Sequence, residues 1–369
     1  MTHEKTQALM NEINAAFKSN VLTTASDPNY EVTCLPTGLL PIDLLLHGGL
    51  PRGRFVEIYG DFSTLKSYVG YRAIAETQRN GGICALIDTE RSFDPAWAES
   101  IGVDVSQLLM PNRNDMETGE QAIDMAETLV RTKQVDLIVV DSIAAMLPQA
   151  ERKKRLHDES NQPGRLAALM SLACRKITAA NGSTSVLWVN QTRMNIGITF
   201  GSPVTTSGGK AMGFYASYRL SCKKTGKITR DIQSWDGTQN VNVKEQVGQK
   251  IKISVEKSKL SRPFRDVNLI WDYENASIDI IDFLTSYGVE KGLIGRQGNT
   301  WTYEDISSIG RTNFKKKLKA RPELLAKMEQ EALSSVDRKS SVEHVELSDT
   351  DDTVNPVVKR KRGRPKKGE

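Results

Sequence analysis

An apolar strand that runs into a phosphate-binding loop is the feature that most restricts how this chain can fold. Residues 54–67 read RFVEIYGDFSTLKS, in which Gly60 is followed six residues later by Lys66 and then by Ser67. This spacing matches the consensus of glycine, four residues, glycine, lysine and serine or threonine, except that Leu65 replaces the second glycine. Such a loop holds phosphates through inward-pointing backbone N–H groups and the N-terminus of the next helix. A glycine turn after a strand is also common without any ligand, so the loop alone leaves both interpretations open.

Three further apolar runs end in polar residues that suit the same site. Asp141 follows the apolar part of VDLIVVDS, Glu90 closes ICALIDTE, and Gln191 closes SVLWVNQ. Continuous apolar runs of this length are typical of strands buried on both faces of a parallel sheet. Ligands bind such sheets outside the carboxyl ends of the strands, where an acidic residue can hold Mg²⁺. A polar residue at one strand end can be a simple cap, but strand ends that carry Lys, Glu, Asp and Gln together indicate one phosphate site in an α/β fold.

The order and spacing of several segments make the chain similar to a known family. From Pro36 to about Tyr273 it resembles the RecA family of bacterial recombinases. The resemblance implies a RecA-like P-loop ATPase core with a central, mostly parallel sheet, and an activity that uses ATP and Mg²⁺. The matching segments are PTGLLPIDLLLHGGLPRGRFVEIYG (36–60), IDTERSFDPAWAESIGVD (87–104), TGEQAIDMAETLVR (118–131), VDLIVVDSIAAMLPQAE (135–151) and NQTRMNIGITFGSPVTTSGGKAMGFYAS (190–217).

The resemblance implies a role for each residue of the phosphate site. Glu90 matches the family's catalytic glutamate, which orients and polarises the water that attacks the γ-phosphate. Asp141 and Ser67 match the Mg²⁺ ligands, and Gln191 matches the glutamine that senses the γ-phosphate. The nucleotide-binding residues implied in the same way are Gly60, Asp61, Phe62, Ser63, Thr64, Leu65, Lys66 and Ser67.

Further residues match positions at the family's subunit interface. Lys257 and Lys259, in ISVEKSKLSRPF, match lysines that reach the phosphates of the neighbouring subunit. Positive charge supplied by a neighbour is the logic of an arginine finger, and it makes hydrolysis depend on assembly. Without the resemblance, the alternation of residues 251–259 favours two lysines on the exposed face of a strand. Phe214 matches an apolar interface residue of RecA filaments, and Phe17 lies on the apolar face of an N-terminal helix that needs a partner surface.

Two loops are candidates for binding DNA. Residues 151–164 (ERKKRLHDESNQPG) contain four consecutive basic residues where better-known family members are acidic; a solvated charged turn is the alternative. Residues 194–209 (MNIGITFGSPVTTSGG) are too rich in glycine and polar residues for a strand or helix, and their N–H groups can hold phosphates. Their apolar residues can wedge between bases. The expected DNA-binding residues here and nearby are Arg152, Lys153, Lys154, Arg155, Arg165, Arg175, Arg193, Met194, Asn195, Ile196, Gly197, Phe200, Ser207, Gly208, Gly209 and Lys210.

Three positions depart from the family pattern. Leu65 adds a side chain where the loop needs a freely chosen φ angle or a close approach of the backbone, and the bulky Phe62 lies beside it. Both changes predict weaker or shifted nucleotide binding. Val204 replaces an acidic family residue that couples DNA contact to ATP binding, so this coupling is expected to be altered. Because every residue assigned to hydrolysis is present, we expect a working but slow ATPase.

The chain divides into four parts by composition and pattern. Residues 5–18 predict an amphipathic helix, and 118–131 and 165–180 predict helices of the ATPase core. In 165–180 the apolar residues follow 3.6-residue spacing. Near the C-terminus, TNFKKKLKARPELLAKMEQEAL is helical in pattern and belongs to a small α/β domain. The predicted parts are 1–35 (oligomerisation helix and linker), 36–277 (ATPase core), 278–333 (small C-terminal domain) and 334–369 (disordered tail).

The tail ends in a strongly basic motif. Residues 359–367 read KRKRGRPKK, with seven basic residues in nine, and most familiar bacterial relatives end acidic instead. Arg362 and Arg364 flank a glycine and precede Pro365, a pattern that resembles an AT-hook, which places guanidinium groups in an A·T-rich minor groove. A generic basic tail for solubility or nuclear import remains the alternative.

Composition limits the compartment and the chemistry. The four cysteines are scattered without a CxxC pair, so we expect buried thiols in a reducing compartment, and the four histidines form no cluster that predicts a transition metal. No apolar run approaches the length of a membrane span and no signal peptide is recognised. We therefore expect a cytoplasmic protein of a bacterium, or of a phage in its host cytoplasm, without a membrane partner.

Together these observations predict an ATP-dependent DNA recombinase. It would form a helical filament of its own copies on single-stranded DNA, pair it with homologous double-stranded DNA and exchange strands. Two alternatives stay open. A hexameric RecA-fold motor such as a helicase would unwind DNA from an end without exchanging strands, and a non-hydrolysing relative would only coat DNA, as Leu65 would favour.

Overall fold

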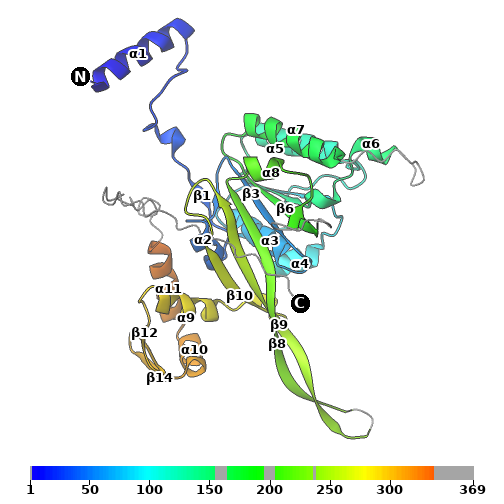
Figure 1. Cartoon of the computed structure of the whole chain (residues 1–369), viewed down its shortest axis with the longest axis vertical. Coiled ribbons are helices and arrows are strands. Elements are labelled where there is room, and N and C mark those ends of the chain that lie inside the picture. Colours follow the sequence, from blue (N-terminus) through cyan, green and yellow to red (C-terminus); the bar gives the residue numbers. More distant parts are fainter. Residues whose placement is uncertain (1, 154–163, 195–203, 236–237, 336–369) are drawn as a thin grey trace, which may run out of the picture.

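One large sheet organises the computed structural model of this chain, which describes residues 2–153, 164–194, 204–235 and 238–335 (Figure 1). Within these ranges the sheet has nine strands, in the order β11-β10-β9-β8-β3-β6-β5-β4, and β7 pairs with the end of β6. Strands β8, β3, β6, β5 and β4 are parallel, whereas β9, β10 and β11 are antiparallel to their neighbours. The predicted α/β fold with a mostly parallel central sheet is therefore confirmed.

The parallel half of the sheet sets the position of the candidate site. Its strands are β3 (Phe55–Gly60), β4 (Cys84–Asp88), β5 (Leu137–Asp141) and β6 (Ser185–Met194). Strand β3 lies in the middle, where Gly60 pairs with Gln191 of β6 on one side and with Cys222 of β8 on the other. Asp88 of β4 pairs with Asp141 of β5. This register aligns the carboxyl ends of these four strands at the same end of the sheet, where α/β proteins bind their ligands.

The antiparallel half is dominated by a long hairpin. Strand β8 (Tyr218–Trp235) starts inside the sheet and continues beyond it, and β9 (Asn240–Ser258) returns antiparallel to it into the sheet, so that the two form a two-stranded arm (Figure 1). Strand β10 (Asp266–Asp272) pairs with β9 only as far as Gly248, and β11 (Ser277–Ile278) completes this edge.

Helices cover both faces of the sheet. One face carries α2 (Leu40–Leu45), α3 (Lys66–Arg79) and α4 (Pro95–Ile101), and the other carries α5 (Gly119–Arg131), α7 (Arg165–Ala180) and α8 (Ala211–Tyr215). Helix α5 begins where Thr118 and Gln121 form a reciprocal capping box. The predicted helices at 118–131 and 165–180 are confirmed, and the buried residues of α7 are Met170, Ala173, Cys174 and Ile177.

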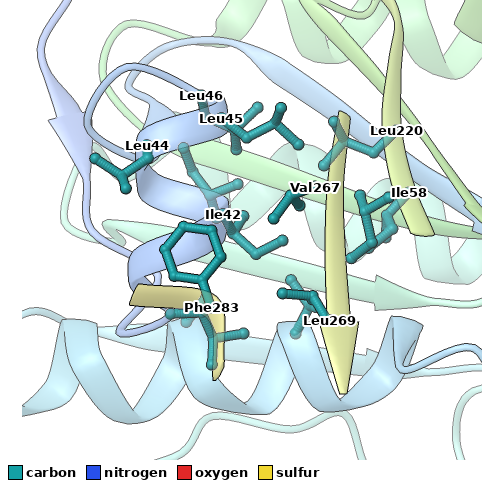
Figure 2. Close-up of a cluster of buried hydrophobic side chains, with 14 of the residues drawn as sticks. Ile42, Leu44, Leu45, Leu46, Ile58, Leu220, Val267, Leu269 and Phe283 are labelled. Atoms are coloured by element: carbon teal, nitrogen blue, oxygen red, sulfur yellow. The ribbon is translucent and has the colours of Figure 1, made fainter. Parts of the chain in front are cut away.

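The C-terminal part shares the core of the α3 face. Figure 2 shows Leu45 and Leu46 near Leu220, and Phe283 of α9 (Ile280–Glu290) beside Ile42. All five side chains belong to one buried apolar cluster, which continues into the C-terminal strands and helices. These elements are β12 (Gly295–Gln297), β13 (Thr300–Tyr303), β14 (Ile306–Ile309), α10 (Arg311–Lys319) and α11 (Pro322–Ser334).

Two local predictions need correction. The segment read as one helical pattern near the C-terminus is two helices, because Pro322 cannot continue α10 and instead begins α11. The loop at 194–209 was predicted to contain no strand, yet β6 extends to Met194 and pairs with β7 (Val204–Thr206). The β-branched residues Thr192, Val204, Thr205 and Thr206 favour this short ladder over an irregular loop.

The N-terminal helix α1 (Thr2–Phe17) stands apart from the rest of the chain in Figure 1. The remaining short elements are η1 (Pro28–Tyr30), β1 (Cys34–Leu35), β2 (Leu50–Pro51), η2 (Ile143–Ala145) and α6 (Gln149–Arg152). Cys84, Cys174 and Cys222 are buried and Cys34 is half-buried, all as free thiols. Among the described residues, no helix combines the length and the apolar character that crossing a membrane requires.

Candidate nucleotide-binding and catalytic site

The phosphate loop connects β3 directly to α3, as its sequence predicts. It starts at Gly60, where a side chain would collide with the carbonyl oxygen of Cys222 in the adjacent strand. Helix α3 begins at Lys66, and its N-cap residue Leu65 has φ 67° and ψ 14°, in the left-handed region. The backbone therefore adopts, with a leucine, a conformation that normally calls for glycine.

Hydrogen bonds within the loop hold Lys66 across it. The Lys66 ammonium donates to the carbonyl oxygen of Asp61 over 2.7 Å, and the Thr64 hydroxyl donates to the same oxygen over 2.8 Å. The Phe62 N–H is bound by the Asp61 carboxylate at 2.8 Å. Burial lowers the pKa of the Lys66 ammonium, whereas the carboxylates of Asp141 and Glu90 act in the opposite direction. Lys66 is thus a buried cation directed into the loop.

Ser67 and Asp141 meet at the mouth of this loop. The Ser67 hydroxyl donates to Asp141 Oδ2 over 2.6 Å. Burial raises the pKa of Asp141 to about 6, and the neighbouring Glu90 and Asp88 carboxylates add to this effect, while the Ser67 hydrogen bond opposes it. A hydroxyl and a carboxylate are hard oxygen ligands, so this pair fits Mg²⁺.

Glu90 is held by two donors from neighbouring strand ends. The Ser142 hydroxyl donates to Glu90 Oε1 over 2.5 Å, and Gln191 Nε2 donates to the same oxygen over 2.8 Å. The backbone N–H groups of Thr89 and Glu90 both donate to the Asp141 carbonyl. Glu90 is exposed and Ser142 is fully buried, so the carboxylate sits on a rigid support at the rim of the site.

A buried polar network lies behind Gln191. The amide of Asn190 donates to Glu57 Oε1 over 2.8 Å and to the Ser207 carbonyl over 2.9 Å, and its oxygen accepts from the Gln191 N–H at 2.9 Å. Arg219 forms an ion pair with the fully buried Glu57. This network joins the strand that carries Gln191 to the end of the predicted second DNA loop.

The two predicted interface lysines lie beside α8. The Lys257 ammonium donates to the carbonyls of Gly213, Phe214 and Ala216 over 2.6, 3.0 and 2.9 Å, and so caps this helix. Burial lowers the pKa of Lys257 to about 8, with Lys259 as the next contribution. Lys259 is exposed, and 71% of Phe214 is accessible to solvent.

The predicted DNA-binding residues differ in exposure, and some of them lie outside the described residues. Arg152 is exposed, ends α6 and forms an ion pair with Glu117, and Lys153 follows it. Ser207 and Gly208 are instead buried, and Arg193 Nε donates to the Ser207 hydroxyl over 2.9 Å. Besides Arg152 and Lys153, the exposed members are Arg175, Arg193, Met194, Gly209 and Lys210, and Arg165 is half-buried. Outside the described residues lie Lys154, Arg155, Asn195, Ile196, Gly197, Phe200, Arg362 and Arg364.

Two residues that touch the site carried no recognisable signal in the sequence. Ser142 follows Asp141, where any small polar residue looks like a strand end. Gln249 of β9 donates from Nε2 to the Ser63 carbonyl over 2.8 Å, across a separation of 186 positions. Only the fold brings this pair together.

Comparison with known proteins agrees with this geometry. A family model described as the RecA N-terminal domain matches residues 4–277. Protein RecA of Brucella anthropi is 39% identical over 336 residues, which cover 88% of this chain and 88% of that protein. Protein RecA of Thermus thermophilus is 38% identical over 347 residues, which cover 92% of this chain and 97% of that protein.

Proposed function

The chain belongs to the RecA family and is a recombinase that acts in DNA recombination and repair. We propose, on this basis, that it is a DNA-dependent ATPase. In this proposal it assembles as a filament on single-stranded DNA, pairs it with homologous double-stranded DNA and exchanges strands. Its proposed location is the cytoplasm of a bacterium, whether the gene belongs to the bacterium or to a phage.

One observation carries the proposal. The phosphate loop and the Glu90 cluster lie at the carboxyl end of the same parallel sheet, because β3, β6, β5 and β4 pair in this order with matching register. Glu90 Oε1 is bound by Ser142 and Gln191, so the carboxylate is oriented before any substrate arrives. Phosphoryl transfer depends mainly on positioning and charge stabilisation, which this arrangement supports.

In the proposed reaction, ATP is the substrate of the loop. Lys66 contacts the β- and γ-phosphates, and Ser67 and Asp141 would hold Mg²⁺. When bound, Mg²⁺ neutralises charge on the phosphate oxygens. Glu90 orients a water whose oxygen forms the new bond to the γ-phosphorus while the bond to the β–γ bridging oxygen breaks; ADP and inorganic phosphate result, and the water's proton passes to the phosphate products. Gln191 contacts the γ-phosphate and reports its presence to the DNA loop that follows β6.

Lys257 and Lys259 are proposed to supply positive charge to the neighbouring copy's site. This role requires Lys257 to leave the carbonyls of α8, and the exposed Lys259 to leave the Tyr215 carbonyl, to which it donates over 3.4 Å. Mixing a Lys257→Ala/Lys259→Ala protein with a Glu90→Gln protein should restore part of the activity, since mixed interfaces combine intact Glu90 with intact lysines. No recovery in verified mixed filaments would contradict catalysis between copies.

Assembly and DNA binding are proposed to use the remaining surfaces. The N-terminal part, 1–35, would dock on a neighbouring copy through α1, on which Phe17 is exposed, and Phe214 would contribute to the same interface. The core (36–277) would bind DNA through the two loops, while 278–333 forms a small accessory domain. The basic tail within 334–369 would contact duplex DNA, with Arg362 and Arg364 in an A·T-rich minor groove.

ATP turnover with and without single-stranded DNA, read beside electron microscopy of the product, tests the proposal. A recombinase should show DNA-stimulated turnover together with helical filaments and strand exchange. Closed hexameric rings with unwinding from a DNA end would indicate the motor instead. Filaments without measurable turnover would indicate a DNA-coating protein.

A further inference from the structure

The phosphate loop has a backbone conformation that its own residues disfavour. Two residues other than glycine adopt left-handed backbone conformations within it, Ser63 with φ 51° and Leu65 with φ 67°. Side chains with a Cβ avoid this region because of steric conflict with the backbone. Contacts from outside the loop are therefore needed to hold it in the conformation that glycine would permit.

The first such contact comes from the base of the β8–β9 hairpin. Gln249 Nε2 donates to the Ser63 carbonyl over 2.8 Å. Gln249 is only 6% exposed, and it sits between Lys227 of β8 and Trp271 of β10 in the sheet. With paired strands on both sides, the donor is placed by the sheet rather than by the loop itself.

The second contact comes from β8. The Lys224 ammonium lies 3.9 Å from the centre of the Phe62 ring, and 73% of Phe62 is exposed. Lys224 lies two residues beyond Cys222, which pairs with Gly60, so both strand residues face the loop side of the sheet. A cation over an aromatic face is attracted to it, so Lys224 steadies the outer part of the loop.

We propose that Gln249, assisted by Lys224, is a positioning residue for nucleotide binding in this chain. A trans peptide group directs its C=O and N–H to opposite sides. When Gln249 holds the Ser63 carbonyl on the hairpin side, the Thr64 N–H points the other way, toward the phosphates. The hairpin thus replaces the missing glycine as the source of the loop's shape. This inference rests on the proposed binding of ATP at residues 60–67.

Titration of the full-length protein with ADP and with a non-hydrolysable ATP analogue tests this role. Gln249→Ala should raise the Kd of both nucleotides about threefold to tenfold, the range expected for one net hydrogen bond. Gln249→Glu should have at least the same effect, because an ionised carboxylate cannot donate. Turnover at saturating ATP should stay within about twofold of the parent, since neither change touches the reacting atoms.

A suppressor separates positioning from a general loss of stability. Adding Ser63→Gly to Gln249→Ala should recover at least half of the lost affinity, because glycine adopts the left-handed conformation at the braced position without help. Gln246→Ala is the matched control: this glutamine of the same strand bonds Tyr273 instead, and its loss should leave affinity unchanged. Phe62→Ala changes an exposed side chain and should weaken binding by up to about threefold.

The outcomes distinguish this inference from the function on which it rests. A parent protein that binds neither nucleotide would overturn the proposed function and the inference together. A parent that binds, with unchanged Kd in Gln249→Ala, would overturn the inference alone. The inference is also wrong if Gln249→Ala lowers turnover at unchanged Kd, or if Ser63→Gly recovers nothing in a folded double variant.

Discussion

The phosphate loop and the rim of strand ends belong to one site but reach their geometry in different ways. On the rim, Glu90, Asp141 and Gln191 are placed by the register of buried parallel strands. In the loop, Ser63 and Leu65 hold left-handed backbones that their own side chains disfavour, with Gln249 bonded from a distant strand. The rim is therefore robust to changes in loop residues, whereas the loop depends on its surroundings. Variants should then separate into those that alter turnover and those that alter nucleotide affinity.

Glu90→Gln should give the largest effect and should act on turnover alone. The glutamine oxygen can still accept from Ser142 and Gln191, but the group has lost the charge that is proposed to polarise the attacking water. Turnover should fall by at least about 100-fold, a typical contribution of such a group, with nucleotide Kd within about threefold of the parent. Steady-state kinetics and nucleotide titration measure the two quantities. Glu99→Gln, at an exposed position of α4, should change neither; a Glu90→Gln protein with parental turnover would remove Glu90 from the mechanism.

Lys66→Ala changes the phosphate loop and should alter nucleotide affinity. The ammonium is buried and directed into the loop, where charge-assisted hydrogen bonds to phosphates each contribute about 1.5 to 3 kcal/mol. Nucleotide Kd should therefore rise by about 10-fold to 100-fold, measured by titration. Lys319→Ala, on the exposed side of α10, controls for the loss of one positive charge. Unchanged affinity in Lys66→Ala would mean that residues 60–67 form only a turn.

Ser142→Ala tests whether the hydrogen bond from Ser142 holds Glu90 in position. Ser142 is fully buried and donates to the Glu90 carboxylate, so its loss should let Glu90 move and, if Glu90 has the proposed role, should slow turnover about tenfold without changing Kd. Ser217→Ala removes another buried hydroxyl, between α8 and β8, and should leave turnover near the parental value. Equal losses in both variants would point to general destabilisation rather than to Glu90.

The sequence predicts the rim better than it predicts the contacts that support the loop. The strands of the rim were predictable because strands covered on both faces form continuous apolar runs, and α7 was predictable because its apolar residues recur at 3.6-residue spacing. The arm of the β8–β9 hairpin was not predicted, since its exposed, mixed residues follow neither periodicity clearly. Gln249 could not be assigned at all, because its partner lies 186 positions away. Contacts made by the fold, unlike patterns along the chain, become visible only in the structure.

The smallest effect concerns the backbone at Leu65 and tests whether the loop is strained. In a helix interior, glycine is less stable than alanine by roughly 1 kcal/mol, but at positive φ the order should reverse by a similar amount. Leu65→Gly should therefore be more stable than Leu65→Ala by about 1 kcal/mol, because both lose the same partly buried side chain and only glycine relieves the left-handed conformation. Denaturant midpoints of the two variants measure this difference. Arg175, which is exposed within α7, provides the control: there Arg175→Ala should be more stable than Arg175→Gly. If Leu65→Ala is more stable than Leu65→Gly, the loop does not hold the left-handed backbone in solution. The proposed difference between the loop and the rim would then be wrong.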